Sequence, residues 1–205
     1  MTQQTIRRRL SAPARRERIE QAAVGTFAAR GYDAASIGEI AAAAGVSRTV
    51  LYDHFPSKRA LYLHVLSAEN DEMLAAVGRG ITGAGPGRNR MKATIAAYLD
   101  YSRSRPAARQ LLIDPIPSGD RELDQVMRAM QSSRSQTVAT LLAADLERSG
   151  VPEASSAAPI VVELLIAGID GVARWWADRP EMRLDDVTDA AFRLLWNGLP
   201  RFSEG

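Results

Sequence analysis

The sequence predicts an all-α fold. Apolar residues recur every three or four positions along nearly the whole chain, whereas no segment shows the period-two alternation of a half-buried strand. Prolines and glycines fall between the periodic segments, where they end helices. With 205 residues, of which 46% are apolar, the chain can bury a core as one domain or as a small domain followed by a larger one.

Basic residues are concentrated at the N-terminal end. Residues 1–60 hold ten Lys and Arg against five Asp and Glu, whereas residues 61–205 hold sixteen against nineteen. The first region therefore carries the charge that attracts a polyanion, although the formal charge of the whole chain is only +2. Because the chain has no cysteine and only two histidines, we expect neither a disulfide nor a metal site, and we expect no cofactor.

Residues 1–13 include the cluster Arg7 to Arg9 but lack the apolar segment of a secretory signal, so we expect a flexible basic arm and a cytoplasmic protein. Such an arm is either solubilising or inserts into a minor groove. The most apolar stretch, residues 160–176, is interrupted by charged residues and is shorter than the roughly 20 residues of a membrane span. We interpret it as a buried helix and expect no membrane association.

Residues 14–30 predict the first helix. Ile19, Ala23 and Phe27 recur at positions i, i+4 and i+8, and together they form an apolar stripe. Gly31 follows as a C-terminal stop. The stripe predicts one side of a small core.

Two short helices are expected next. Ser36 and Glu39 fit the capping box that begins a helix, and Gly45 can adopt the left-handed conformation of a tight helix exit. Ser47 caps the following helix, which ends near Pro56. Two short helices joined by such a turn are the parts of a helix-turn-helix, so residues 14–60 predict a DNA-binding domain of three helices.

The rest of the chain predicts a larger helical domain over residues 61–205. Ser57 caps a helix that is expected to run to about Val77, and residues 78–87, with five glycines, predict a loop. A phosphate-cradling role for this glycine-rich loop is disfavoured because no strand precedes it. Further helices are expected at residues 88–104, 107–113, 121–149, 157–178 and 184–198.

The third helix has two chemically different faces. Projected at about 100° per residue, Leu51 and Phe55 face inward. The small core that they complete would contain Ile19, Phe27, Ile37, Ile40 and Val46. The outward face carries Thr49, Val50 and Asp53, flanked by Arg48, Tyr52 and His54. A short helix that presents hydrogen-bonding groups and a methyl-bearing side chain suits a major groove.

This region resembles the TetR family of bacterial regulators. The resemblance rests on the runs TFAARGY at residues 26–32, IGEIAAAAGVS at residues 37–47 and LYDHFPSKRAL at residues 51–61. It covers about a quarter of the chain, and the remainder matches only in helix pattern and length. The resemblance implies a DNA-binding N-terminal end and a ligand-binding, dimerising C-terminal end.

The resemblance also implies DNA contacts. Arg48 and Thr49 correspond to readers of base edges, and Arg48 can donate two hydrogen bonds to guanine. Tyr52 corresponds to a contact with the backbone or a thymine methyl, although it can instead cover the edge of the core. His54 and Lys58 correspond to phosphate contacts, although His54 at a helix C-terminus is also favoured by the helix dipole.

Three further residues of this surface are less constrained. Ser36, at the entrance of the second helix, would offer the helix dipole to a phosphate. Val50 can contact only a methyl group. Asp53 either accepts a hydrogen bond from a cytosine amine or is a solvated or internally paired acid.

The last two helices carry more apolar surface than one subunit covers, which favours self-association. The resemblance implies a four-helix bundle across a two-fold axis, and a purely intramolecular core is the alternative. The predicted interface residues are Val161, Leu165, Gly168, Val172, Trp176, Leu194 and Leu195.

The resemblance places an effector pocket between the DNA-binding and dimerising elements. Apolar and aromatic residues dominate the candidates, which suggests a small apolar or amphipathic effector, and each candidate can instead be ordinary core. The candidates are Met73, Val77, Tyr98, Tyr101, Leu112, Met127, Met130 and Trp175.

These features predict a ligand-responsive homodimeric regulator, most simply a repressor that binds a palindromic double-stranded DNA operator and is released by its effector. A DNA-binding dimer without an effector is a second interpretation. An enzyme is disfavoured, because the chain contains no nucleophile-elbow, zincin or Walker motif.

Overall fold

The computed structural model describes residues 11–85, 87–148 and 157–198, and these residues form nine α-helices without a strand. The predicted all-α class is confirmed. The helices are α1 (Ala12–Ala34), α2 (Ile37–Ala44), α3 (Arg48–His54), α4 (Lys58–Ile81), α5 (Arg88–Ser104), α6 (Pro106–Ile113), α7 (Arg121–Arg148), α8 (Ala157–Ala177) and α9 (Leu184–Gly198). Residues 1–10 of the expected basic arm lie outside the described residues.

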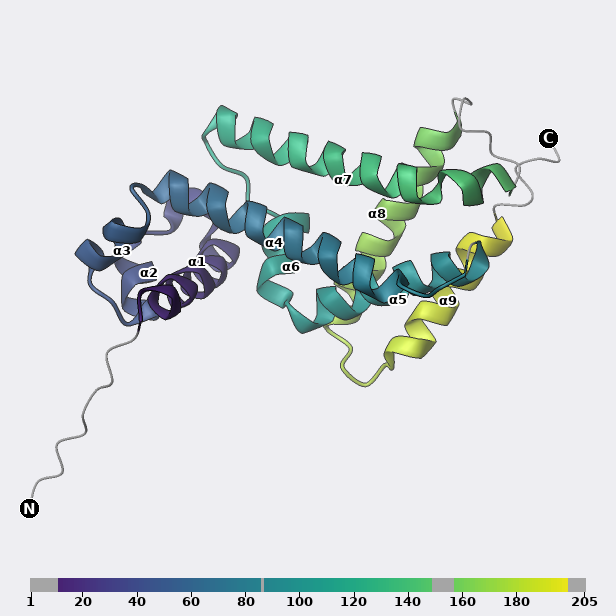
Figure 1. The fold of residues 1–205 in the computed structure, drawn as a ribbon, viewed down its shortest axis with the longest axis horizontal. Coiled ribbons are helices and arrows are strands. Elements are labelled where there is room, and N and C mark those ends of the chain that lie inside the picture. The colour runs from purple at the N-terminus through teal and green to yellow at the C-terminus, as the bar shows by residue number, and fades with distance from the viewer. Residues whose placement is uncertain (1–10, 86, 149–156, 199–205) are drawn as a thin grey trace, which may run out of the picture.

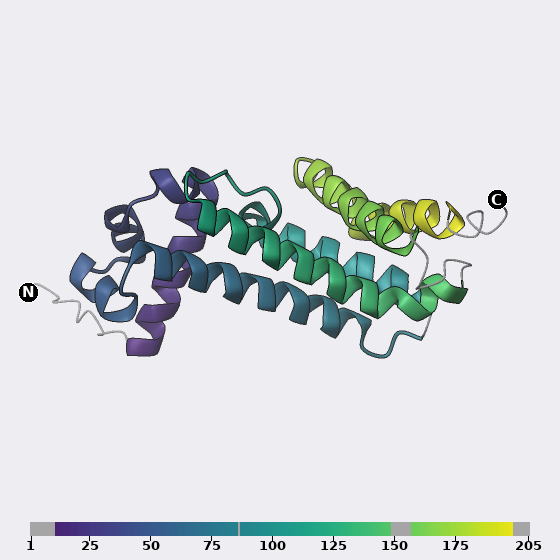
Figure 2. The ribbon, with the colours of Figure 1, turned by 90° about the horizontal axis from the view of Figure 1, so that it is seen from above.

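The first three helices form a head at one end of the molecule, and α4 leads from this head into the body (Figure 1). Figure 2 shows α8 and α9 together on one side of the body, far from the head. Within the described ranges, no helix is long and apolar enough to cross a membrane.

The local signals that begin and end the head helices act as expected. Ser36 and Glu39 form both hydrogen bonds of the capping box at the start of α2. Gly45 ends α2 in the left-handed conformation, with φ of 67°. Ser47 and Ser57 accept hydrogen bonds from backbone N–H groups in the first turns of α3 and α4. The turn between α2 and α3 is therefore set by local chemistry.

The predicted end of the fourth helix was wrong. Residues 78–87 were expected to form a loop, but α4 continues through Gly78 and Gly80 to Ile81. A Cβ atom added to Gly80 would lie 2.3 Å from the Cβ of Ala97 on α5. Close packing between α4 and α5 thus uses the glycine inside a helix, and this tertiary contact overrides the low helix propensity of glycine.

The first core joins the head to the body. It contains the predicted inward residues of the head, of which Ile19, Ile40 and Leu51 are fully buried, while Val46 is half-buried at its edge. The same cluster continues through α4 into Leu111 of α6 and Leu123 of α7. The head therefore shares its core with helices that belong to the larger part of the chain.

A second core lies between α5, α8 and α9. Leu99, Phe192 and Trp176 are among its most deeply buried members. Helices α8 and α9 are thus attached to α5 by their own apolar contacts.

The glycine predicted to stop the first helix lies at a sharp bend. Gly31 has φ of 72° and ψ of 173°, and α1 resumes helical conformation after it, as far as Ala34. A Cβ atom at this position would lie 2.8 Å from Cγ2 of Ile116, which precedes α7. Both the backbone conformation and the close contact require glycine.

Replacing Gly31 with alanine should lower the free energy of unfolding by about 1–3 kcal/mol, because L residues rarely adopt this conformation. Gly25→Ala is the matched control: a Cβ there meets nothing within 4 Å, and alanine in a helix is favoured by about 0.5–1 kcal/mol. Urea unfolding of both variants measures the difference. Equal stabilities would contradict a constraint at Gly31.

Candidate nucleic-acid interface and internal cavity

Helix α3 presents a polar face to solvent. Arg48, Thr49 and Asp53 are exposed, and the side chain of Tyr52 is 49% exposed. Leu51 is fully buried on the opposite side. Because about half of Tyr52 is covered, both interpretations of it stay open, and the contacts of this face with DNA stay predictions.

Two other predicted contacts on α3 are less accessible. Val50 and His54 are half-buried. His54 occupies the last turn of α3, where its backbone oxygen accepts a hydrogen bond of 3.5 Å from Nη1 of Arg16. Arg16 also lies over the ring of Phe55, with its Cζ atom 4.4 Å from the ring centre. The C-terminal end of α3 is thereby fixed against α1.

Arg48 packs against α2. A Cβ atom added to Gly38 would lie only 2.3 Å from Nη2 of Arg48, so the guanidinium occupies the space that a larger residue would fill. Sequence reasoning named Arg48 but missed Gly38 as its support. The glycine at the third position of the capping box, Gly38, was the feature of the sequence that could have indicated this support.

The ammonium group of Lys58 forms contacts within the protein. Its Nζ atom donates hydrogen bonds to the backbone oxygens of Asp33, at 3.1 Å, and Ala35, at 2.9 Å, and lies 4.5 Å from the ring centre of Tyr32. An ammonium group has three protons, so one stays available to a phosphate. In this structure Lys58 chiefly ties the start of α4 to the end of α1.

The entrance of α2 is already occupied by a carboxylate. The backbone N–H of Ser36 donates to Oε2 of Glu39 at 3.0 Å, and the hydroxyl of Ser36 accepts from the backbone N–H of Glu39. Hydrogen bonding of the Glu39 carboxylate by the backbone N–H of Ser36, and then by the Ser36 side chain, lowers the pKa of Glu39. A phosphate at this position would meet the negative charge of Glu39, so the predicted contact of Ser36 with a phosphate would compete with the capping box.

A partly open cavity of about 220 Å³ lies between α4, α5, α7 and α8. Three of the predicted pocket residues, Met73, Val77 and Tyr98, line it. The residues that sequence reasoning missed come mainly from α7 and α8, whose periodicity does not show which face meets a cavity. They include Gln131, Arg134, Ser135, Thr137, Val138, Leu165, Ile166, Ile169 and Asp170.

The other predicted pocket residues lie elsewhere. Tyr101 and Leu112 are buried in the first core, and Met127 and Met130 pack against it. Trp175 is 47% exposed on the outside of α8, where Arg179 stacks 4.2 Å from its ring centre. None of these five residues lines this cavity. Tyr101 and Leu112 are closely packed core residues, whereas Met127 and Met130 are only half-buried.

The polar groups of the cavity wall come from three helices. Tyr98 on α5 donates a short hydrogen bond to Oδ1 of Asp170 on α8. Burial raises the pKa of both Tyr98 and Asp170, and it lowers the pKa of Arg134 on α7. Desolvated charges thus border a largely apolar space.

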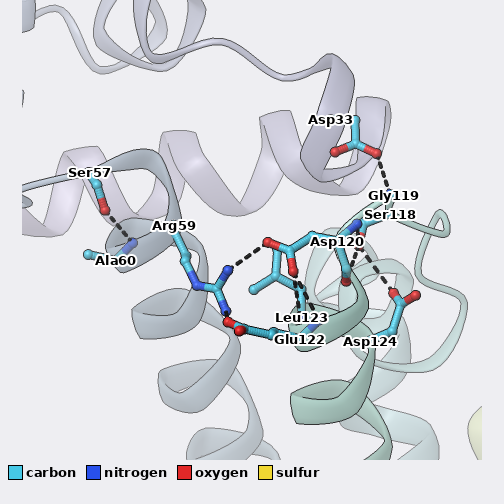
Figure 3. A network of polar contacts seen from close by, with 10 residues as sticks. All are labelled: Asp33, Ser57, Arg59, Ala60, Ser118, Gly119, Asp120, Glu122, Leu123 and Asp124. Carbon is cyan, nitrogen blue, oxygen red and sulfur yellow. Dashed lines mark hydrogen bonds and ion pairs between the residues drawn. The ribbon is translucent and has the colours of Figure 1, made fainter.

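A polar network fastens the start of α7 to the head (Figure 3). Arg59 donates to Asp120 at 2.6 Å and to Glu122 at 2.7 Å. The backbone N–H of Gly119 donates to Asp33 at 2.7 Å. Asp120 also accepts from the N–H groups of Glu122 and Leu123, in the first turn of α7.

Comparison with known proteins identifies the family. The model of the bacterial regulatory proteins of the tetR family matches residues 19–65, which include α2 and α3. The chain is 32% identical over 193 residues to the HTH-type transcriptional activator FasR of Mycolicibacterium smegmatis, covering 93% of this chain and 85% of FasR. The chain belongs to the TetR family. It is a DNA-binding transcriptional regulator and not an enzyme.

Solved TetR-like structures show the same fold. A TetR-like regulator from Rhodococcus sp. RHA1 is 24% identical, with a TM-score of 0.74 over 93% of this chain and 98% of that one. The FadR regulator of Bacillus subtilis, solved in complex with stearoyl-CoA, is 16% identical, with a TM-score of 0.73 over 89% of this chain and 98% of that one. The helical arrangement around the cavity is thus shared.

Four of the predicted dimer residues of this TetR-family chain face its own interior. Val161, Leu165 and Trp176 are buried in the second core, and Leu195 packs against it and lines the cavity. Helix α8 therefore turns its three residues toward the core that it shares with α5 and α9. Val172 is half-buried, and Gly168 and Leu194 are exposed.

The surface of α8 and α9 nevertheless carries large apolar side chains. Ile160, Leu164 and Trp175 on α8 are 58%, 62% and 47% exposed, and Leu194 on α9 is 76% exposed. The predicted interface contained their neighbours Leu165 and Trp176 instead. A Cβ added to Gly168 meets nothing within 4 Å, so nothing among the described residues covers this part of α8.

Gly38→Ala should change base preference without a large loss of stability, because the added methyl group displaces only the flexible end of Arg48. The expected loss of discrimination at one base pair is about 1–3 kcal/mol, as for Arg48→Ala. Binding to a set of singly substituted duplexes measures the preference.

Gly25→Ala in α1 serves as the control, because its added Cβ lies in open space. If Gly38→Ala keeps the base-preference profile of the unaltered protein while Arg48→Ala changes it, the supporting role of Gly38 is wrong.

Proposed function

We propose that this TetR-family regulator binds a pseudo-palindromic operator as a homodimer, and that a small apolar or amphipathic effector in the cavity controls its affinity for DNA. The observation that carries the proposal is the exposed polar face of α3, on a head whose core extends into the cavity-bearing body. In a dimer, the two α3 helices would enter successive major grooves about 34–36 Å apart.

The apolar surface of α8 and α9 supports the dimer. Ile160, Leu164 and Trp175 recur along α8 at the spacing of one helical face, and Leu194 adds a side chain from α9. Leaving this much aliphatic and aromatic area in water is unfavourable, and a two-fold interface would bury it twice. The open space over Gly168 lets a partner helix approach closely.

The cavity supports an effector. Its walls are mostly aliphatic, and the structurally similar FadR of Bacillus subtilis was solved with stearoyl-CoA. A ligand shifts the conformational equilibrium only by its differential affinity for the two states. An effector that prefers a head spacing unsuited to DNA would release the operator. The prediction of a repressor remains part of this proposal, although the relative FasR is described as an activator.

Two connections would transmit the binding of an effector. Helix α4 lines the cavity with Met73 and Val77 and reaches the head with its first turns. Helix α7 lines the cavity with Arg134. The start of α7 is tied to the first turn of α4 through Arg59, and the residue Gly119 just before it is tied to Asp33 of the head. Displacement of either helix by a ligand would therefore reorient α3.

Selection of bound duplexes from a random pool tests the proposal. We expect an inverted repeat whose half-sites are centred about one helical turn apart. The variant Arg48→Ala, selected in parallel, should recover a repeat with relaxed preference at one position in each half-site. Recovery of no common sequence, or of a single half-site, would overturn the proposed dimeric recognition.

Leu164→Glu and Leu194→Glu should each produce monomers, because a charge would have to be buried in the two-fold interface. Operator affinity should fall by about a hundredfold when the two heads are no longer linked. Analytical ultracentrifugation and DNA titration measure the two effects. Ala75→Glu, at an exposed position of α4, is the control. Variants that remain dimers would place the interface elsewhere.

A further inference from the structure

We propose that Arg134 anchors the effector by donating a hydrogen bond to an sp² oxygen, so that the cavity selects aliphatic compounds with a carboxylate or a thioester carbonyl. This inference rests on the proposed function, because it assumes that the cavity holds the effector. It adds the chemical class of the ligand and the residue that recognises its polar end.

Arg134 is an incompletely bonded cation in the cavity wall. Its Nη2 atom donates to the backbone oxygen of Leu112 at 3.2 Å. Its Nη1 atom is buried and has no hydrogen-bond partner among the described residues. An unpaired donor on a desolvated charged group costs more than a neutral one. Because Nη1 is shielded by its neighbours, the guanidinium must turn toward the cavity for a ligand to supply the missing acceptor.

The surrounding charges determine which acceptor fits. Asp170 offsets part of the charge of Arg134 and accepts the hydrogen bond of Tyr98, while Arg174 and Asp114 form an ion pair of 3.0 Å nearby. A guanidinium has donors only, so the matching group on a ligand must be an acceptor. A carboxylate or carbonyl oxygen provides one, and an ammonium group would be repelled.

The rest of the wall fits a flexible hydrocarbon chain. Met73, Leu74 and Val77 on α4 face Val138 on α7 and Ile166 on α8 across the cavity. Among the described residues of the wall, Tyr98 alone carries an aromatic ring, so stacking of a flat ligand is not favoured. The volume of about 220 Å³ leaves room for an alkyl chain.

Binding of four chain-matched probes to the full-length protein tests the inference. Octanoate and octanoyl-CoA present a carboxylate and a thioester, octylammonium presents a donor, and 1-bromooctane has the chain without oxygen. Isothermal titration calorimetry of the unaltered protein should show binding of at least one oxygen-bearing probe, at least tenfold tighter than that of octylammonium. The stronger of the two oxygen-bearing probes identifies the source of the sp² oxygen.

Arg134→Met should weaken the oxygen-bearing probe at least tenfold and leave 1-bromooctane unchanged or tighter. Ser132→Ala, at an exposed position of α7 outside the cavity wall, is the matched control and should change neither. Arg134→Lys keeps the charge, so partial affinity is expected. If Arg134→Met does not fold, judged by circular dichroism, the lysine variant carries the test: it should weaken the oxygen-bearing probe and spare 1-bromooctane.

Two results would overturn the inference in distinguishable ways. Unchanged affinity of the oxygen-bearing probes in the folded Arg134 variant, or equal binding of octylammonium, would remove Arg134 as the anchor while leaving the cavity as an effector site. Failure of all four probes to bind would contradict both the anchor and the proposed effector cavity.

Discussion

The structure depends on the continuous core that α4 shares between the head and the body. Leu61 and Leu66 of α4 are fully buried in the core that also contains residues of α1, α2 and α3, and Met73 lies about two turns after Leu66, at the cavity. The same core includes Leu111 of α6 and Leu123 of α7. Because close-packed interiors change between discrete arrangements rather than deform continuously, a shift at the cavity is expected to reach α3 as a movement of the whole head.

Polar contacts also connect the helices that share this core. Glu69 on α4 is buried and accepts two hydrogen bonds from Arg105, at 3.1 and 2.6 Å, which holds the start of α6 against α4. Arg59 is partly exposed, so its bonds to Asp120 and Glu122 contribute modestly to stability. These bonds mainly fix the orientation of α7. Asp120 accepts from Arg59 of α4 and also caps α7, so it links the two helices.

Local chemistry made the head predictable from sequence, whereas packing decided the rest. The capping box, the left-handed glycine and the outward side chains of α3 each depend on residues within one or two helical turns. The course of α4 through Gly80 depends on a contact with Ala97, which is distant in sequence. The apolar periodicity predicted that α8 is an apolar helix, but it did not predict which side of α8 is buried. The buried Trp176 and the exposed Trp175 are neighbours, and only contact with α5 and α9 distinguishes them.

The distance between the two heads of a dimer tests most directly whether α3 is presented in duplicate and controlled from the cavity. The chain contains no cysteine, so Gln21→Cys at an exposed position of α1 introduces a single spin-label site in each subunit. Pulsed electron paramagnetic resonance should give one narrow inter-label distance on the selected operator, and octanoyl-CoA or octanoate should shift or broaden it. Absence of dipolar coupling between labels, or a distribution that bound ligand leaves unchanged, would contradict this mechanism.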